Sequence, residues 1–256
     1  MRQYADDRNL AARQRLWAHQ RPPFDLLEWV LGLTPLSPRA RVLDAGCGNG
    51  RYLSALRRRG IIATGCDLSL GMLRSAGAHP RLVQADAGAL PFVSGSFDVA
   101  IAAHMLYHVD EPAVAAAELR RVLRSGGVLL AVTNGGRHLR SLHRLIEDAV
   151  RQDVPRWRMR DPAARRFSLG NGATSLASAF ASVTLVRPQP AENRPFAIRD
   201  PAVVRDYVAS LAATYEDRAG ISWPVVVERV RVAAEAAIER DGGLVVEGDP
   251  GAFVCR

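Results

Sequence analysis

The sequence predicts an α/β fold in which a doubly wound, mostly parallel sheet is covered by helices on both faces. Short apolar segments alternate with helical segments from residue 40 to residue 133, the pattern of strands joined by right-handed crossovers. Glycines separate the first apolar segment from the first helix, and acidic residues end the first three strands. Together these observations indicate a ligand site at the carboxyl edge of the sheet.

The elements follow in order along the chain. We expect strands at 41–44, 61–67, 81–85, 97–103, 128–133 and 182–186. We expect the helices that join and follow them at 51–59, 70–76, 111–124, 137–150, 173–180, 200–211 and 224–240. Ser69 is a suitable N-cap for the second of these helices. The apolar segments 244–246 and 252–255 flank a Gly-Asp-Pro-Gly turn and are expected to form a closing hairpin.

Two amphipathic segments precede the first strand. Residues 4–19 and 24–33 have helical periodicity and are separated by Arg-Pro-Pro, and residues 34–39 form a linker rich in Pro and Ser. We therefore expect an N-terminal helical cap over residues 1–36 and a second domain over residues 37–256.

Composition and charge narrow the class of protein. The chain is 48% hydrophobic and 23% charged, which argues against a largely disordered protein. The net charge of +8 suggests nucleic acid as a partner. However, all 34 basic residues are arginines spread along the chain, and no nucleic-acid recognition module is present. Nucleic acid is therefore not the expected partner.

The cysteines and the N-terminal sequence indicate the cellular compartment of the protein. Cys47, Cys66 and Cys255 form no CxxC pair, so neither a disulfide framework nor a metal site is expected. The first residues lack the apolar core of a signal peptide, and no apolar run is long enough to span a bilayer. We expect a cytoplasmic protein without a metal and without a membrane partner.

The candidate site centres on the glycine turn at 41–50, RVLDAGCGNG. Glycines at alternate positions allow positive φ and a close approach of a ligand, and the following helix points its N–H groups into the same space. Asp44, Asp67 and Asp86 end successive strands and should meet at one sheet edge. Asp67 follows Gly46 by 21 residues, close to the interval of about 20 at which an acidic residue binds ribose hydroxyls in dinucleotide folds.

A nicotinamide dinucleotide explains this site poorly. Its fingerprint, G-x-G-x-x-G, fails because Arg51 occupies the third glycine position. Asp44 would also repel a pyrophosphate while suiting a cation. A ligand with a ribose, an adenine and a positive centre therefore explains the acidic residues better.

Five segments resemble, in order and spacing, the class I S-adenosylmethionine-dependent methyltransferases: VLDAGCGNG, CDLS, QADAGALPF, FDVAIAAHMLYHV and ELRRVLRSGGVLLAVTNG. They are most similar to the type 11 domain of quinone-biosynthesis and natural-product tailoring enzymes, over about residues 40 to 135. The resemblance implies a Rossmann-like sheet of seven strands. It also implies S-adenosylmethionine as cofactor, S-adenosylhomocysteine as product, and a small-molecule acceptor methylated at O, N or C.

The resemblance also implies which residues bind the cofactor. The methionine and ribose part would be lined by Asp44, Gly46, Cys47 and Gly48. Asp67 would bind both ribose hydroxyls. The adenine would be contacted by Leu68, Met72, Asp86 and Ala87. Ala103 and His104 would border the methionine portion near the transferred methyl.

Candidate catalytic residues follow the fourth strand. His104 and His108 lie near the predicted methyl position, and an imidazole suits proton removal near neutral pH. Packing or loop fixing is the alternative for both, and more so for His108. Methylation of an amine needs no base, because alignment of nucleophile, methyl and sulfur suffices.

Residues outside the core segments have roles only by resemblance. Tyr4 and Arg13 would close over the cofactor, with Arg13 paired to the methionine carboxylate; a tyrosine covering the core and an arginine on a solvated face are the alternatives. Residues 151–170 and 195–241 would form insertions on the substrate side. An RNA or protein methyltransferase and a non-catalytic cofactor-binding domain remain as alternative functions. The sequence leaves the oligomeric state open, with monomer and homodimer as the alternatives.

Overall fold

The computed structural model describes residues 8–160, 162–189, 195–215 and 220–256. The chain divides into two compact units that interleave along the sequence. The first comprises Met1–Phe24, Arg137–Arg160 and Gln189–Asp249, and the second comprises Asp25–Gly136, Asp161–Pro188 and Pro250–Arg256. We call the second the sheet unit and the first the helical unit, and describe each separately.

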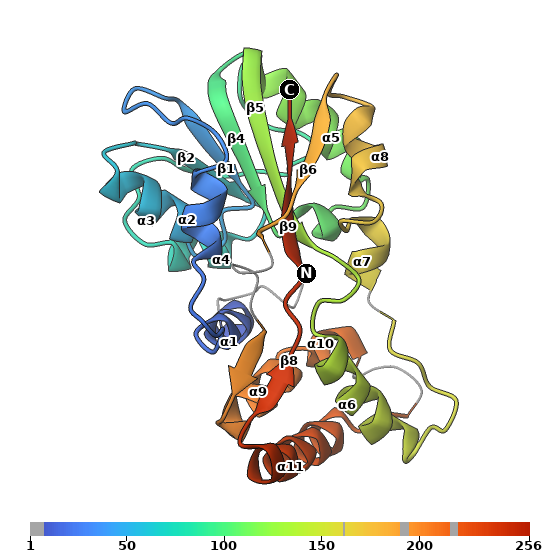
Figure 1. The fold of residues 1–256 in the computed structure, drawn as a ribbon. Helices are drawn as coiled ribbons and strands as arrows, with labels where there is room; N and C mark the ends of the chain where they lie inside the picture. Colours follow the sequence, from blue (N-terminus) through green and yellow to red (C-terminus); the bar gives the residue numbers. More distant parts are fainter. Residues whose placement is uncertain (1–7, 161, 190–194, 216–219) are drawn as a thin grey trace. The chain divides into compact units, whose positions relative to one another are not determined.

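The sheet unit contains seven strands among its described residues, in the order β3-β2-β1-β4-β5-β9-β6 (Figure 1). They are β1 (Val42–Ala45), β2 (Thr64–Asp67), β3 (Leu82–Gln84), β4 (Phe97–Ala103), β5 (Leu123–Asn134), β6 (Val183–Val186) and β9 (Pro250–Cys255). The first five strands in this order run parallel, and β9 runs antiparallel to both β5 and β6. The mostly parallel, seven-stranded sheet expected from the sequence is confirmed.

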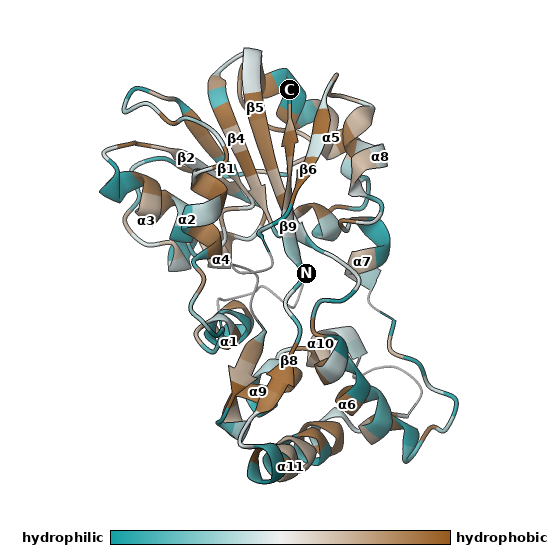
Figure 2. Cartoon of the chain, viewed as in Figure 1, coloured by the Kyte–Doolittle hydropathy of each residue, from teal (hydrophilic) through white to brown (hydrophobic). Residues whose placement is uncertain are grey.

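Alternation along the strands divides the core of this unit between two faces. On β4, Ala100 and Ala102 pack into one cluster with helices α5 (Pro112–Val122) and α8 (Gly172–Ala177). Val99 and Ile101 pack into the other cluster with α2 (Leu26–Leu31) and α3 (Arg51–Arg58). Figure 2 shows hydrophobic residues along the central strands β4 and β5, as expected for strands buried on both faces.

Local signals set the ends of several helices. Ser69 caps α4 (Leu70–Ser75) by accepting a hydrogen bond from the Met72 N–H, as the sequence suggests. Asp25 caps α2 in the same way through the Glu28 N–H. The 3₁₀-helix η2 (Leu106–His108) and α7 (Pro162–Arg166) complete the helices of the sheet unit within the described residues.

The helical unit has its own core. Its helices are α1 (Arg8–Trp17), α6 (Arg140–Arg151), α9 (Pro201–Ala209), α10 (Ala212–Tyr215) and α11 (Trp223–Asp241), and its strands β7 (Phe196–Ile198) and β8 (Leu244–Val246) pair antiparallel. Trp223 is fully buried in this core and donates a hydrogen bond from Nε1 to the carbonyl of Val208 at 2.9 Å. Helices α1 and α2, expected as one cap, belong to different units.

Two expectations about local structure are wrong. The helix expected at 111–124 ends at Val122, because Leu123 pairs with Phe97 across a register shift and extends β5. The hairpin expected from 244–246 and 252–255 does not form. Instead β8 pairs with β7, while β9 inserts between β5 and β6. A strand's partner is a long-range choice, which the turn sequence between the two segments does not decide.

Candidate active site

Asp44 lies at the carboxyl end of β1 and is only 1% exposed. Burial first, and then the negative charge of Asp67, raise the pKa of its carboxyl to about 8. Among the described residues, no group forms a hydrogen bond with Asp44 Oδ2, which is enclosed. A buried, unpartnered carboxyl oxygen is costly, so the carboxyl favours its neutral form or a ligand that supplies the missing partner.

The glycine turn follows Asp44 directly. Gly46, Gly48 and Gly50 have φ of 66°, 54° and 77°, in the left-handed region that favours glycine. A Cβ at Gly46 would lie 2.6 Å from the Cβ of Met105, so this position has no room for a side chain. The N–H of Cys47 donates to the carbonyl of Cys66 at 2.9 Å and ties the turn to β2. The backbone therefore favours glycine at all three positions, and packing also requires it at Gly46.

Asp67 ends β2 and holds the turn through its carboxylate. One oxygen accepts a hydrogen bond from the Gly48 N–H at 2.9 Å, and the other accepts one from the Ser69 N–H at 2.8 Å. Each carboxylate oxygen can accept further bonds, so the pair can still receive two hydroxyl donors. This arrangement suits a ribose diol.

The end of β3 lies beside the end of β2. The Ala85 N–H donates to the Asp67 carbonyl at 3.1 Å. Asp86 is exposed and accepts a hydrogen bond from the Gly88 N–H at 2.8 Å. The remaining residues predicted for the adenine differ in exposure: Ala87 and Met72 are buried, whereas Leu68 is 42% exposed. An exposed carboxylate beside apolar side chains can bind an exocyclic amino group.

The end of β4 brings a histidine and a methionine to the same edge. Ala103 ends the strand, and His104 follows with φ of 54° while its N–H donates to the Val132 carbonyl at 2.9 Å. Burial lowers the pKa of the His104 imidazole to about 4, so the ring is neutral near pH 7 and a weak base. Met105 reaches the glycine turn, as the Gly46 geometry shows.

His108 has a different environment. It lies in η2, where its ring packs edge-on against Tyr107 with centroids 4.5 Å apart. This contact is what a packing role requires, although it leaves the catalytic prediction untested.

Two predicted cofactor residues lie outside this edge. Tyr4 lies outside the described residues. Arg13 belongs to the helical unit, where its Nε donates to Ser210 Oγ at 3.2 Å and its Nη2 donates to the Ser210 carbonyl at 3.1 Å. The roles of both at the cofactor stay predictions.

Asn134 is a candidate that sequence reasoning missed. It ends β5, the next strand of the same sheet edge, and its Oδ1 is enclosed without a hydrogen-bond partner among the described residues. The sequence signal was available, because Asn134 follows the fifth apolar strand just as the acidic residues follow the first three.

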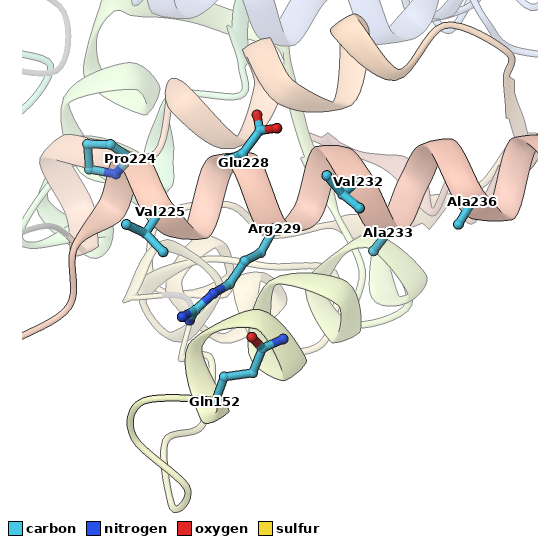
Figure 3. A pocket seen from close by; sticks show the side chains of 8 residues that line it. All are labelled: Gln152, Pro224, Val225, Glu228, Arg229, Val232, Ala233 and Ala236. Atoms are coloured by element: carbon cyan, nitrogen blue, oxygen red, sulfur yellow. The ribbon is translucent and has the colours of Figure 1, made fainter.

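A separate hollow of about 650 Å³ lies within the helical unit (Figure 3). It is lined by α11 and the C-cap of α6: Gln152, Pro224, Val225, Glu228, Arg229, Val232, Ala233 and Ala236. Arg229 is paired with Asp153 at 2.6 Å. The hollow contains none of the predicted cofactor residues.

The described part of the chain shows no group of three or more metal-ligating side chains. Among the same residues, no helix has the length and hydropathy needed to cross a membrane. The free thiols of Cys47, Cys66 and Cys255 are all buried.

Comparisons with known proteins find similarity to methyltransferases. A family model described as a methyltransferase domain matches residues 43–131, from β1 into β5. The chain is 36% identical over 168 residues to the malonyl-[acyl-carrier protein] O-methyltransferase of Enterobacter lignolyticus, covering 62% of each protein. It is 33% identical over 201 residues to the protein of the same name from Pseudescherichia vulneris, covering 66% of this chain and 78% of that protein. The chain thus spans only 62% of the length of the Enterobacter relative.

The fold has solved counterparts. A protein from an antibiotic biosynthesis pathway of Anabaena variabilis aligns with a TM-score of 0.67 at 18% identity, covering 90% of this chain and 96% of that one. At this identity the likeness bears on the fold alone.

Proposed function

Because the chain belongs to the class I S-adenosylmethionine-dependent methyltransferases, we propose that it transfers a methyl group from this cofactor to a small-molecule acceptor. The observation that carries the proposal is the carboxylate of Asp67, which is fixed by two backbone N–H groups and retains acceptor capacity for a ribose diol. A domain that merely shared the sheet would not need this arrangement.

The residues at the carboxyl edge fit the cofactor. The enclosed Asp44 Oδ2 offers an acceptor for a positively charged group, and the turn that follows it has no side chain at Gly46 or Gly48, where the backbone has positive φ. Asp67 would hold the ribose, and Asp86 would hold the adenine amino group beside Ala87 and Met72. When bound, S-adenosylmethionine supplies an electrophilic methyl on a sulfonium. The chain's part is to align the acceptor with that methyl.

The protonation state of His104 indicates which methyl acceptors suit this site. Its buried, neutral imidazole can accept a hydrogen bond from the hydroxyl group of a methyl acceptor. Its lowered pKa makes the imidazole a weak base. Acidic acceptors such as phenols and carboxylic acids, or amines, therefore suit this site better than unactivated alcohols. The two relatives are O-methyltransferases by name, which makes an oxygen acceptor the first to test.

The remaining features of the proposal rest on the sequence. We assign residues 151–170 and 195–241 to acceptor binding, and Tyr4 and Arg13 to closure over the cofactor. We place the enzyme in the cytoplasm, which the free thiols support, and its acceptor among secondary metabolites. Metal and nucleic acid have no part in the proposed reaction.

Calorimetry with three ligands tests the cofactor. S-adenosylmethionine and S-adenosylhomocysteine should bind, and NAD should not. Asp67→Ala should weaken both sulfur ligands at least tenfold, since the ribose loses its acceptor pair. Asp98→Asn is the matched control, because Asp98 lies at the opposite end of β4, where it accepts from the Arg41 N–H. Failure of wild type to bind either sulfur ligand would remove the proposal.

A transfer assay tests catalysis. The protein is incubated with methyl-labelled cofactor and with panels of phenols, carboxylic acids and amines, and with bulk tRNA. Label appearing in a small molecule supports the proposal. Label in tRNA with steep salt dependence would favour an RNA methyltransferase instead. Binding without transfer to any panel would favour a non-catalytic domain.

A further inference from the structure

We propose that Asp44 selects for positive charge in the ligand: its carboxyl carries a proton while the edge is empty and releases that proton when a cationic nucleoside binds. This inference rests on the proposed function but concerns a property that methyl transfer does not require.

The position of Asp44 in the sheet supports a switchable charge. Its strand neighbours are Gly65 on β2 and Ile101 on β4, neither of which carries a charge. The side chain is enclosed, and one oxygen lacks a hydrogen-bond partner within the part of the chain that the structure describes. A carboxylate in such surroundings gains from protonation unless a cation arrives.

The charged and titratable groups around Asp44 reinforce this state. From β2, Asp67 adds a negative charge that further raises the Asp44 pKa. The thiols of Cys47 and Cys66 and the phenol of Tyr52 on α3 all have raised pKa values, through burial first and the Asp44 charge among the next causes. All three therefore stay neutral near pH 7 and supply no compensating cation.

Three other titratable groups of the sheet unit are not among the groups that shift the Asp44 pKa. Arg51 at the start of α3 and Asp25 before α2 act on Tyr52, with opposite effects on its pKa. His104 after β4 is uncharged near neutral pH because burial lowers its pKa to about 4. The groups that shift Asp44 thus include no positive charge, so a cationic ligand would be the first to favour its ionised form.

Binding of a cationic ligand is linked to release of the Asp44 proton. With the ligand bound, the Asp44 carboxyl loses its proton to solvent and faces the ligand's positive charge as a carboxylate. Methyl transfer removes the sulfonium charge, so the product holds Asp44 ionised less strongly and binds with less proton release. Asp44 thereby favours the methyl donor over its product.

Calorimetry in buffers of different ionisation enthalpy counts the protons. At about pH 6.5, wild type should release close to one proton per S-adenosylmethionine bound, because the free carboxyl has a pKa of about 8. S-adenosylhomocysteine should release fewer protons, and adenosine, which has neither ammonium nor sulfonium, should release none. Asp44→Asn should still bind adenosine, and it should lack the proton release that wild type shows with S-adenosylmethionine. Because the ligand amine titrates equally in both proteins, the difference between them isolates Asp44.

A second measurement on wild type alone keeps the test independent of the variant's folding. The affinity for S-adenosylmethionine should rise with pH by up to about tenfold per unit and level off near pH 8, while the affinity for adenosine stays flat. Binding of S-adenosylmethionine with no proton release and no such slope overturns this inference and leaves the proposed function standing. Absence of binding removes both.

Discussion

The carboxylate of Asp67 accepts a hydrogen bond from the backbone N–H of Gly48 at 2.9 Å, so the end of β2 holds the glycine turn that follows β1. Its second oxygen accepts from the Ser69 N–H and fixes the start of α4. One side chain thus orients two backbone segments that a nucleoside would contact. These two hydrogen bonds fix the backbone at this sheet edge without a ligand.

Replacing Asp67 with Asn should loosen this arrangement. An amide nitrogen cannot accept a hydrogen bond, so either the Gly48 or the Ser69 N–H loses its partner. We expect the free energy of unfolding to fall by about 1–3 kcal/mol, measured by urea denaturation. A ligand that binds only the folded state, S-adenosylhomocysteine, should raise both proteins' stability, but the variant's less. Equal stability and equal affinity in Asp67→Asn would contradict the assigned role.

Gly46→Ala should destabilise the sheet unit more than Gly60→Ala. Both glycines have positive φ, but an Ala Cβ at 46 would lie 2.6 Å from the Met105 Cβ, whereas nothing lies within 4 Å of one at 60. We expect about 1 kcal/mol of backbone strain at 60 and roughly 1–3 kcal/mol of overpacking in addition at 46. Chemical denaturation of the two variants measures the difference. Equal losses would show that Met105 moves aside freely.

Asp44→Asn should change the pH dependence of stability. The folded-state pKa of Asp44, about 8, lies above its unfolded value. Protonation of Asp44 therefore contributes to the free energy of unfolding, and this contribution is fully present below about pH 4. This contribution is lost as pH rises through 8, at up to about 1.4 kcal/mol per pH unit. The stability of wild type relative to the variant should therefore fall between about pH 4 and pH 8. A pH-independent difference would mean that Asp44 is ionised in the folded protein.

His104 should titrate far below an ordinary histidine. Burial lowers the pKa of its imidazole to about 4, so its ring signals in an NMR titration should move near that pH. His104→Asn assigns the signals, and Asn tolerates the positive φ at this position. A midpoint at pH 6 to 7 would restore His104 as a strong candidate for the general base.

Trp223→Phe should weaken the helical unit. The substitution removes the donor to the Val208 carbonyl and shrinks a side chain that stacks on Tyr215 at 5.3 Å. We expect a loss of about 2–3 kcal/mol from the lost indole hydrogen bond and a small cavity, while the Val208 carbonyl keeps the Leu211 N–H as a donor. Trp157→Phe is the control, because Trp157 is only partly buried and meets the same Tyr215 edge-on at 6.0 Å. A larger loss in the control would contradict the assignment of Trp223 as the centre of this core.

The glycine turn and the strand ends beside it could be predicted from sequence because their signals are local. Glycines at alternate positions, the Ser69 cap and an acidic residue at the end of each of the first three strands depend on a few neighbouring residues. The structure confirms the strand, turn and cap that they predict. The five parallel strands followed from the same periodicity.

The features that sequence reasoning missed depend on distant partners. The pairing of Leu123 with Phe97 ends a helix earlier than expected. Strand β7 was not expected, and β8 and β9 belong to different sheets instead of one hairpin. The contact of Met105 with the glycine turn and the enclosed oxygen of Asn134 belong to the same class. No local pattern encodes which distant segment will lie alongside.

By itself, the sequence determined the sheet edge, its glycine turn and the three carboxylates, because spacing along the chain is enough to place residues at successive strand ends. Only the tertiary structure decided what state those groups have. Asp44 and Asp67 are both aspartates after a strand, yet Asp44 is enclosed with a raised pKa while Asp67 is satisfied by backbone N–H groups. Protonation depends on desolvation and neighbouring charge, which exist only once distant segments have packed together.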